Sequence, residues 1–208
     1  AGSAHNFRFI RICMAPTKLR KNRPIIPHKD KLFYVRRLSK TAVEIERVFS
    51  ATKQSFKLFT CSDIHIDNPK CKKEKFLADM QKAKDRGSAI IIVGDFLDLM
   101  QGKKDRRHNK ADLLPTLVKD TYITRVVEYG IETLIPFKDN LAMISCGNHE
   151  SSIVNHLEIN PLALMVKELR DLGSQVEYMP YQGWVIIRLS ISKKTAPLIK
   201  IFYNHGNF

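Results

Sequence analysis

The sequence contains no hydrophobic stretch long enough to cross a membrane as a helix. The longest run with the character of a buried segment, Ala89–Val93, is far shorter than the roughly 18 apolar residues that a membrane span needs. Cysteine is also scarce, since the 208 residues include only Cys13, Cys61, Cys71 and Cys146. No Cys-x-x-Cys pair is present, so neither a disulfide scaffold nor a zinc ribbon is expected. This cysteine usage favours a reducing, intracellular compartment.

The chain has no repeat of fixed period, which argues against solenoids, coiled coils and collagen. Residues 1–13 lack a long apolar core followed by a small-residue cleavage site, so they do not resemble a signal peptide. Apolar residues make up 44% of the sequence, a proportion typical of globular proteins rather than disordered ones. We therefore expect one globular domain with an additional arm, located in the cytoplasm and without membrane association.

Acidic residues are few in the first quarter of the chain. The whole sequence has 35 Lys and Arg against 21 Asp and Glu, a net charge of +14. Residues 1–57 hold fourteen of the basic residues and only three acidic ones, so this segment alone carries +11. The basic residues concentrate in Lys18–Arg23 and at Arg36-Arg37. Such an arm can contact phosphate backbones in a salt-sensitive way, or it can be a solvated tail. Within it, a short helix is expected over Leu38–Phe49.

Hydrophobic patterning after residue 54 predicts strands that alternate with helices. A continuous β-branched run indicates a strand buried on both faces, and an amphipathic stretch followed by Gly indicates a helix. The alternation implies a largely parallel sheet with helices on its faces. The last three strands are expected to pair antiparallel, forming or joining a second sheet. The predicted elements are, in order, strand Ser55–Ser62, helix Lys72–Arg86, strand Ala89–Val93, two helical stretches within Ala111–Phe137, strand Leu141–Cys146, helix Pro161–Leu172, and strands Gln175–Met179, Trp184–Ser190 and Leu198–Tyr203.

Each of the principal predicted strands is followed by Asp, His or Asn. Because the carboxyl ends of parallel strands meet at one edge of a sheet, these side chains are expected to converge. Together they form a nitrogen and oxygen ligand set that suits Mn, Fe, Zn, Ni or Co. Any one of the histidines alone would more often be an ordinary hydrogen-bonded residue, so the ordered set carries the argument. Its members, in order, are Asp63-x-His65, Gly94-Asp95-x-x-Asp98, Gly147-Asn148-His149-Glu150 and His205-Gly206.

This ordered set of motifs resembles the calcineurin-like metallophosphoesterases. The resemblance covers about residues 56–208 and implies an α/β fold, a β-sandwich flanked by helices in four layers (α/β/β/α). Asp95–Lys103 and Tyr181–Trp184 are most similar to phosphoesterases encoded by phages and environmental bacteria; for a phage protein, the compartment would be the host cytoplasm. We accordingly divide the chain into a basic arm, residues 1–54, poorly ordered or partly helical, and a phosphoesterase domain, residues 55–208.

The resemblance implies two divalent metal ions, Mn²⁺ in the first place, with Fe, Zn, Ni or Co as alternatives. Asp63 and His65 would bind the first metal, and Asp95 would bridge both. Asn148 and His205 would bind the second. Two such ions about 3.5–4 Å apart lower the pKa of a bridging water, and the hydroxide attacks phosphorus in line with the departing oxygen.

Other motif residues would act beside the metals rather than bind them. By the same resemblance, His149 stabilises or protonates the leaving group. Asp98 would support the site, although an exposed carboxylate at a helix start is the alternative, and Glu150 would orient His149 or its loop. Asp105–His108 could grip a substrate phosphate or form a solvated charged loop.

The sequence departs from the family pattern at its end. The family has a further Gly-His-x-His after the histidine matched by His205, and the sequence stops at Phe208. One histidine per metal is thus missing, the last strands are expected to be incomplete, and we expect a fragment of a longer enzyme. The leading hypothesis is metal-dependent hydrolysis of phosphoric esters, with phosphodiesters, nucleic acid among them, as the expected substrates. The alternatives are a non-catalytic module that binds nucleic acid through residues 18–37 and an unstable fragment without function of its own.

Overall fold

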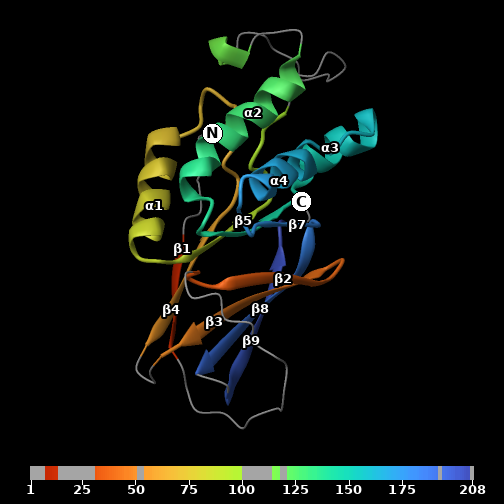
Figure 1. Ribbon diagram of the computed structural model, residues 1–208. Coiled ribbons are helices and arrows are strands. Elements are labelled where there is room, and N and C mark those ends of the chain that lie inside the picture. Colours follow the sequence, from red (N-terminus) through yellow and green to blue (C-terminus); the bar gives the residue numbers. More distant parts are fainter. Residues whose placement is uncertain are drawn as a thin grey trace.

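The computed structural model describes residues 8–13, 31–50, 54–99, 114–117, 121–191 and 194–206. These residues form two β-sheets and four α-helices (Figure 1). The elements are, in chain order, β1 (Arg8–Cys13), β2 (Tyr34–Ser39), β3 (Ala42–Phe49), β4 (Ser55–Cys61), α1 (Lys73–Asp85), β5 (Ala89–Val93), the 3-10 turn η2 (Pro115–Leu117), α2 (Tyr122–Leu134), the 3-10 turn η3 (Ile135–Phe137), β6 (Leu141–Ser145), α3 (Asn148–Leu157), α4 (Pro161–Asp171), β7 (Glu177–Met179), β8 (Gln182–Ile191) and β9 (Lys194–Asn204).

The first sheet has the strand order β1-β4-β5-β6-β7, in which β4, β5, β6 and β7 run parallel and β1 is an antiparallel edge strand. The second sheet has the order β2-β3-β8-β9, with β3 and β8 parallel and the outer pairs antiparallel. The parallel strands of the first sheet end at one edge, as the alternating pattern predicts. That edge is where ligands of α/β proteins bind.

The helices cover one face of the first sheet, and the second sheet packs against the other face (Figure 1). Successive residues of a strand point to opposite faces, and β4 shows this directly. Its Phe59 lies in the helix-facing core with Phe76 of α1, whereas Leu58 lies between the sheets with Val185 of β8. The predicted mixed α/β fold with two sheets is confirmed. Among the described residues all four α-helices contribute to the core on the first sheet, so a fourth layer beyond the second sheet stays a prediction.

The predicted helix over Leu38–Phe49 is wrong, because this segment ends β2 and forms β3. The spacing of Leu38, Ala42, Ile45 and Phe49 suits one face of a helix. In a strand, alternate side chains point to the same face. Val43 and Ile45 therefore both enter the core between the sheets, and this burial favours the strand. Most of the described residues of the predicted arm thus lie in strands β1, β2 and β3.

Two further differences concern the elements after β6. Helix α3, Asn148–Leu157, was not predicted, and it begins immediately after β6 with Glu150 in its first turn. Strand β7 pairs parallel with β6 at the edge of the first sheet, so the expectation that all of the last three strands pair antiparallel is wrong for this one. The antiparallel pairing of β8 with β9 is confirmed.

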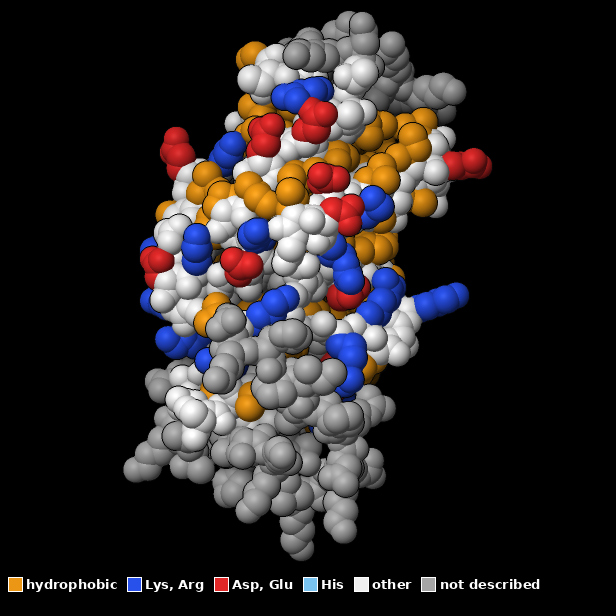
Figure 2. Space-filling view, viewed as in Figure 1, with side chains coloured by type: hydrophobic (Ala, Val, Ile, Leu, Met, Phe, Trp, Pro, Cys, Tyr) orange, Lys and Arg blue, Asp and Glu red, His pale blue; other side chains and the backbone are white. Residues whose placement is uncertain are grey.

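Charge is unevenly distributed over the described surface. On the face shown in Figure 2, the acidic side chains lie mainly over the helices, and Lys and Arg side chains continue onto the sheets below them. The charged stretches Lys18–Arg23 and Asp105–His108 lie outside the described residues. No described helix is both long and apolar enough to span a bilayer.

Candidate metal centre

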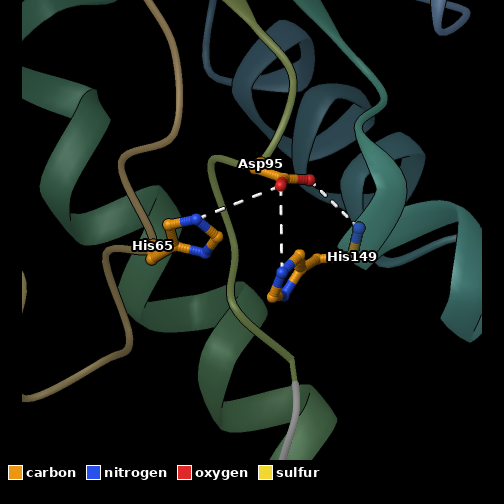
Figure 3. Close-up of side chains that lie close together, drawn as sticks. All are labelled: His65, Asp95 and His149. Carbon is orange, nitrogen blue, oxygen red and sulfur yellow. Dashed lines mark hydrogen bonds and ion pairs between the residues drawn. The ribbon is translucent and has the colours of Figure 1, made fainter. Parts of the chain in front are cut away.

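Four of the five predicted ligands, together with the predicted catalytic His149, converge at the carboxyl end of the first sheet. Asp63 and His65 follow β4, Asp95 follows β5, His149 lies in the first turn of α3 after β6, and His205 follows β9. Two groups of three side chains place their ligand atoms within 4.8 Å of one another. One is His65, Asp95 and His149 (Figure 3) and the other is Asp63, Asp95 and His205. These groups of His and Asp can hold a metal ion.

Asp95 belongs to both groups and is the centre of the site. Its Oδ2 atom lies 3.1 Å from Nε2 of His205, 3.8 Å from Nε2 of His149 and 4.0 Å from Nε2 of His65. Its Oδ1 atom accepts a hydrogen bond from the backbone N–H of His149 at 3.0 Å. Burial alone would raise the pKa of this carboxyl. The hydrogen bonds from His205 and His149 and their positive charge outweigh burial and hold the pKa below its usual value.

All three histidines present Nε2 to Asp95 while an oxygen atom faces Nδ1. Nδ1 of His205 lies 3.0 Å from the carbonyl oxygen of Val93, and Nδ1 of His149 lies 2.6 Å from the carbonyl oxygen of Asp98. Because a carbonyl oxygen only accepts, both Nδ1 atoms carry the proton and leave Nε2 facing the centre. Nδ1 of His65 lies 3.1 Å from the Asp98 carboxylate. This arrangement is typical of histidines that bind metals, whose second nitrogen donates to an outer carboxylate or carbonyl.

The backbone at the site adopts conformations that side chains other than Gly rarely accept. Asp63, His65 and Asp95 have φ values of 55°, 48° and 49°. Each such residue costs on the order of 1–3 kcal/mol and persists only where surrounding contacts hold it. Strain of this kind gathers at functional sites, so three strained predicted ligands at one sheet edge support a functional role.

Two glycines allow the strand ends to approach so closely. A Cβ atom on Gly94 would lie 2.2 Å from Nδ1 of His205, and one on Gly147 would lie 2.1 Å from Oδ1 of Asp95. Gly94 also has a φ of +70°, which a side chain would strain. Both positions therefore require Gly, as the sequence pattern suggests.

His205 is held between two carboxylates. Besides Asp95, its Nε2 lies 3.8 Å from Oδ1 of Asp63, and the ring of Tyr181 packs edge-on against it with centroids 5.5 Å apart. Burial would lower the pKa of this imidazole. The hydrogen bond and charge of Asp95, with the carbonyl of Val93 and the charge of Asp63, outweigh burial and raise the pKa to about 9. Without a metal, His205 therefore carries a proton at neutral pH.

Asp98 is buried and contacts two histidines, so it is not the exposed carboxylate of the alternative interpretation. Its Oδ1 atom is 3.1 Å from Nδ1 of His65 and 3.3 Å from Nδ1 of His149, and its Oδ2 accepts a hydrogen bond from Asn68 at 3.0 Å. Burial would raise the pKa of this carboxyl, but the contacts with His65, Asn68 and His149 lower it below its usual value. Asp98 thus contacts both rings, and its backbone carbonyl orients that of His149.

Glu150 is fully buried and binds the backbone of two site loops. Its side chain accepts hydrogen bonds from the N–H groups of Asp95 at 3.2 Å, Leu97 at 3.0 Å and Gly147 at 2.9 Å. Burial, as the dominant effect, raises the pKa of this carboxyl to about 7. The resemblance implied that Glu150 orients His149 or its loop, and these contacts show that it joins the loop after β5 to the start of α3.

Asp67 was not singled out from the sequence. Like Glu150, it is a carboxylate that binds backbone N–H groups of the loop after β5. It is buried and accepts hydrogen bonds from the backbone N–H of Asp98 at 2.6 Å and of Leu99 at 3.1 Å, and from the hydroxyl of Tyr122 at 2.9 Å. The available signal was its position two residues after His65, where it extends the Asp-x-His pattern. It positions Asp98 and hence the two rings that Asp98 contacts.

The grouping of the side chains differs from the predicted division between two metals. The structure pairs His205 with Asp63 and His149 with His65, around the shared Asp95. Asn148, predicted as a ligand of the second metal, is the first residue of α3 and is exposed. Asp95 at the centre of both groups agrees with a bridging position, whereas the assignment of the other residues to two separate ions stays a prediction.

Comparison of the chain with protein-family models, with curated proteins and with solved structures found no match.

Proposed function

We propose that this protein is a metal-dependent hydrolase of phosphoric esters with a dinuclear centre built around Asp95. One observation carries the proposal. His65, His149 and His205 all turn Nε2 toward a single buried carboxylate while oxygen atoms face their Nδ1 atoms. Such a preorganised nitrogen and oxygen set suits divalent ions such as Mn²⁺. The expected ligands of the pair are Asp63, His65, Asp95, Asn148 and His205.

When bound, two divalent ions would supply an activated water as nucleophile and would neutralise charge on the phosphoryl oxygens. Asp95 can bridge the pair because its carboxylate has two oxygen atoms and lies in both groups. His149 keeps Nδ1 against the carbonyl of Asp98, so its Nε2 can donate a proton to the leaving oxygen when the ring is protonated. Asp98 and Glu150 hold this geometry without contacting the substrate.

The proposal is tested by the hydrolysis of bis-p-nitrophenyl phosphate with Mn²⁺, beside the monoester p-nitrophenyl phosphate. We expect turnover that requires Mn²⁺ and disappears with EDTA, with the diester preferred over the monoester. A folded protein that binds Mn²⁺ yet hydrolyses neither ester would overturn the proposal. Turnover that persists in EDTA would overturn the metal requirement.

Metal binding should release a proton from His205. The contact with the Asp95 carboxylate stabilises the protonated ring and raises its pKa to about 9. A metal that binds at neutral pH must therefore displace this proton. Affinity for Mn²⁺ is therefore expected to rise with pH until about 9. Calorimetric titration near pH 7 in two buffers of different ionisation enthalpy measures the released protons. His205→Gln should lower the number of protons released, and an unchanged release in that variant would contradict the assignment.

A further inference from the structure

A chain of hydrogen bonds joins helix α2 to His149, the residue proposed as proton donor to the leaving group. It begins at Tyr122, the first residue of α2, whose hydroxyl donates to Oδ2 of Asp67 at 2.9 Å. The same Oδ2 atom accepts the backbone N–H of Leu99 at 3.1 Å. The chain ends where Nδ1 of His149 lies 2.6 Å from the carbonyl oxygen of Asp98. The three residues in its middle, Asp67, Asp98 and Leu99, are all buried.

A single peptide group carries the last two of these contacts. The C=O of Asp98 and the N–H of Leu99 belong to the same peptide unit, and the described residues contain no cis peptide bond. In a planar trans peptide the N–H and the C=O point in opposite directions. When the Asp67 carboxylate fixes the N–H, it therefore also aims the carbonyl at the imidazole ring of His149.

The backbone at this turn depends on such contacts. Leu99 has a φ of 54°, a left-handed value that residues other than Gly seldom adopt. Strained conformations of this kind persist only where the surrounding structure holds them. The Leu99 side chain is buried in the helix-facing core, and Oδ1 of Asp67 accepts a second hydrogen bond, from the N–H of Asp98 at 2.6 Å. If the Asp67 carboxylate turned, the carbonyl that holds His149 would turn with it.

Tyr122 restrains the Asp67 carboxylate from outside the turn. Of the three hydrogen bonds described for this carboxylate, two come from the turn that it holds and the third comes from Tyr122. The terminal torsion of an Asp side chain is soft, so a donor with a fixed position restricts it. The Tyr122 ring packs against the helix-facing core, and this packing fixes the position of its hydroxyl.

We propose that Tyr122 is a positioning residue for His149 and acts through the Asp67 carboxylate. The consequence for catalysis rests on the proposed function, in which His149 protonates the leaving oxygen. A proton donor must lie within hydrogen-bond reach of that oxygen, and a misplacement of about 1 Å can lower the rate about a hundredfold. The alternative is that Tyr122 only secures the start of α2, and its hydroxyl would then have no effect on the ring of His149.

Nuclear magnetic resonance of the metal-free protein tests the position of the ring without substrate. A proton on Nδ1 of His149, held by a buried carbonyl, should give a slowly exchanging signal, which His149→Gln identifies by its loss. Tyr122→Phe removes only the hydroxyl and should speed this exchange about tenfold, the effect of losing one hydrogen bond. Tyr129→Phe is the matched control and should leave the exchange unchanged, because Tyr129 lies on the same helix but its hydroxyl accepts a hydrogen bond from Lys73 of α1 at 2.5 Å.

Hydrolysis of two diesters tests the consequence for catalysis. Nitrophenolate leaves readily as an anion, whereas the more basic phenolate gains more from a proton donor. Tyr122→Phe should therefore lower kcat about tenfold with diphenyl phosphate and clearly less with bis-p-nitrophenyl phosphate, and Tyr129→Phe should lower neither. An equal loss with both esters would indicate a structural role alone, so that result, or no loss with diphenyl phosphate, would overturn the proposal.

The exchange measurement decides the proposal even if the protein hydrolyses neither ester. Exchange at the wild-type rate in Tyr122→Phe, or the absence of a slowly exchanging His149 proton in the wild-type protein, would overturn it. Thermal denaturation of each variant verifies that it is folded. Because this measurement needs neither metal nor substrate, its failure is distinguishable from failure of the proposed function.

Discussion

Replacing Asp95 with Asn should abolish Mn²⁺-dependent hydrolysis, with a loss of at least about a thousandfold in kcat/KM. The carboxylate is shared by both ligand groups and is the nearest acidic partner of His205. Asn keeps the size of the side chain and can still accept the backbone N–H of His149 through its carbonyl oxygen. It has no negative charge and only one oxygen, so it cannot bridge two cations. The measurement is steady-state turnover of bis-p-nitrophenyl phosphate together with Mn²⁺ stoichiometry.

Asp171→Asn is the matched control for this substitution. Asp171 ends α4, and its side chain is 59% exposed and paired with Lys167, an arrangement that contributes little to stability. Its removal should change neither turnover nor metal content. If Asp95→Asn kept activity within a few-fold of wild type, hydrolysis would have to occur at a site that does not include Asp95.

Glu150→Ala should lower the free energy of unfolding by about 3 kcal/mol or more, because three buried N–H groups lose their acceptor. For a chain of this length such a loss lowers Tm by about 10 °C. Mn²⁺ affinity should fall as well, since Glu150 holds the backbone of Asp95. Thermal denaturation with and without Mn²⁺ measures both effects, and the exposed Glu168 of α4 provides the matched Glu168→Ala control. If Glu150→Ala lowered Tm no more than Glu168→Ala does, Glu150 would not hold the two site loops together.

The difference in the free energy of unfolding between wild type and Glu150→Ala is expected to depend on pH in a defined direction. Glu150 has a usual pKa of 4.5 that burial raises to about 7 in the folded protein, so the folded state holds this proton more tightly than the unfolded state. The contribution of the group to stability is present below 4.5 and falls as pH rises through 7. In metal-free protein, the stability gap between wild type and Glu150→Ala is expected to narrow from pH 5 to pH 8. A gap that widens would contradict the assigned pKa direction.

The sequence predicted the parts of the fold that depend on local hydrophobic pattern. A strand buried on both faces has a continuous apolar run, as in β5 and β6. A helix buried on one face has apolar residues at helical spacing, as in α1 and α4. The sequence also predicted that Asp63, His65, Asp95, His149 and His205 converge, since parallel strands place their carboxyl ends at one edge. The metal, the reaction and the roles of single residues stay proposals.

Other features depend on contacts between distant segments and could not be read from local pattern. The spacing within Leu38–Phe49 satisfies both a helix and a strand, and pairing with β8, some 140 residues away, decides between them. Asp and His adopt left-handed backbone more often than most residues, but still in only a small share of cases, so residue type alone does not predict it at Asp63, His65 and Asp95. The role of Asp67 becomes apparent only when the chain brings it to the backbone of Asp98 and Leu99.

Electron paramagnetic resonance of the protein loaded with Mn²⁺ tests the central claim most directly. A pair of ions bridged by Asp95 should give an exchange-coupled signal at a stoichiometry of two Mn²⁺ per chain, and Asp95→Asn should give at most an uncoupled mononuclear signal. An uncoupled signal in the wild-type protein, or a coupled signal that survives Asp95→Asn, would contradict a dinuclear centre at this carboxylate.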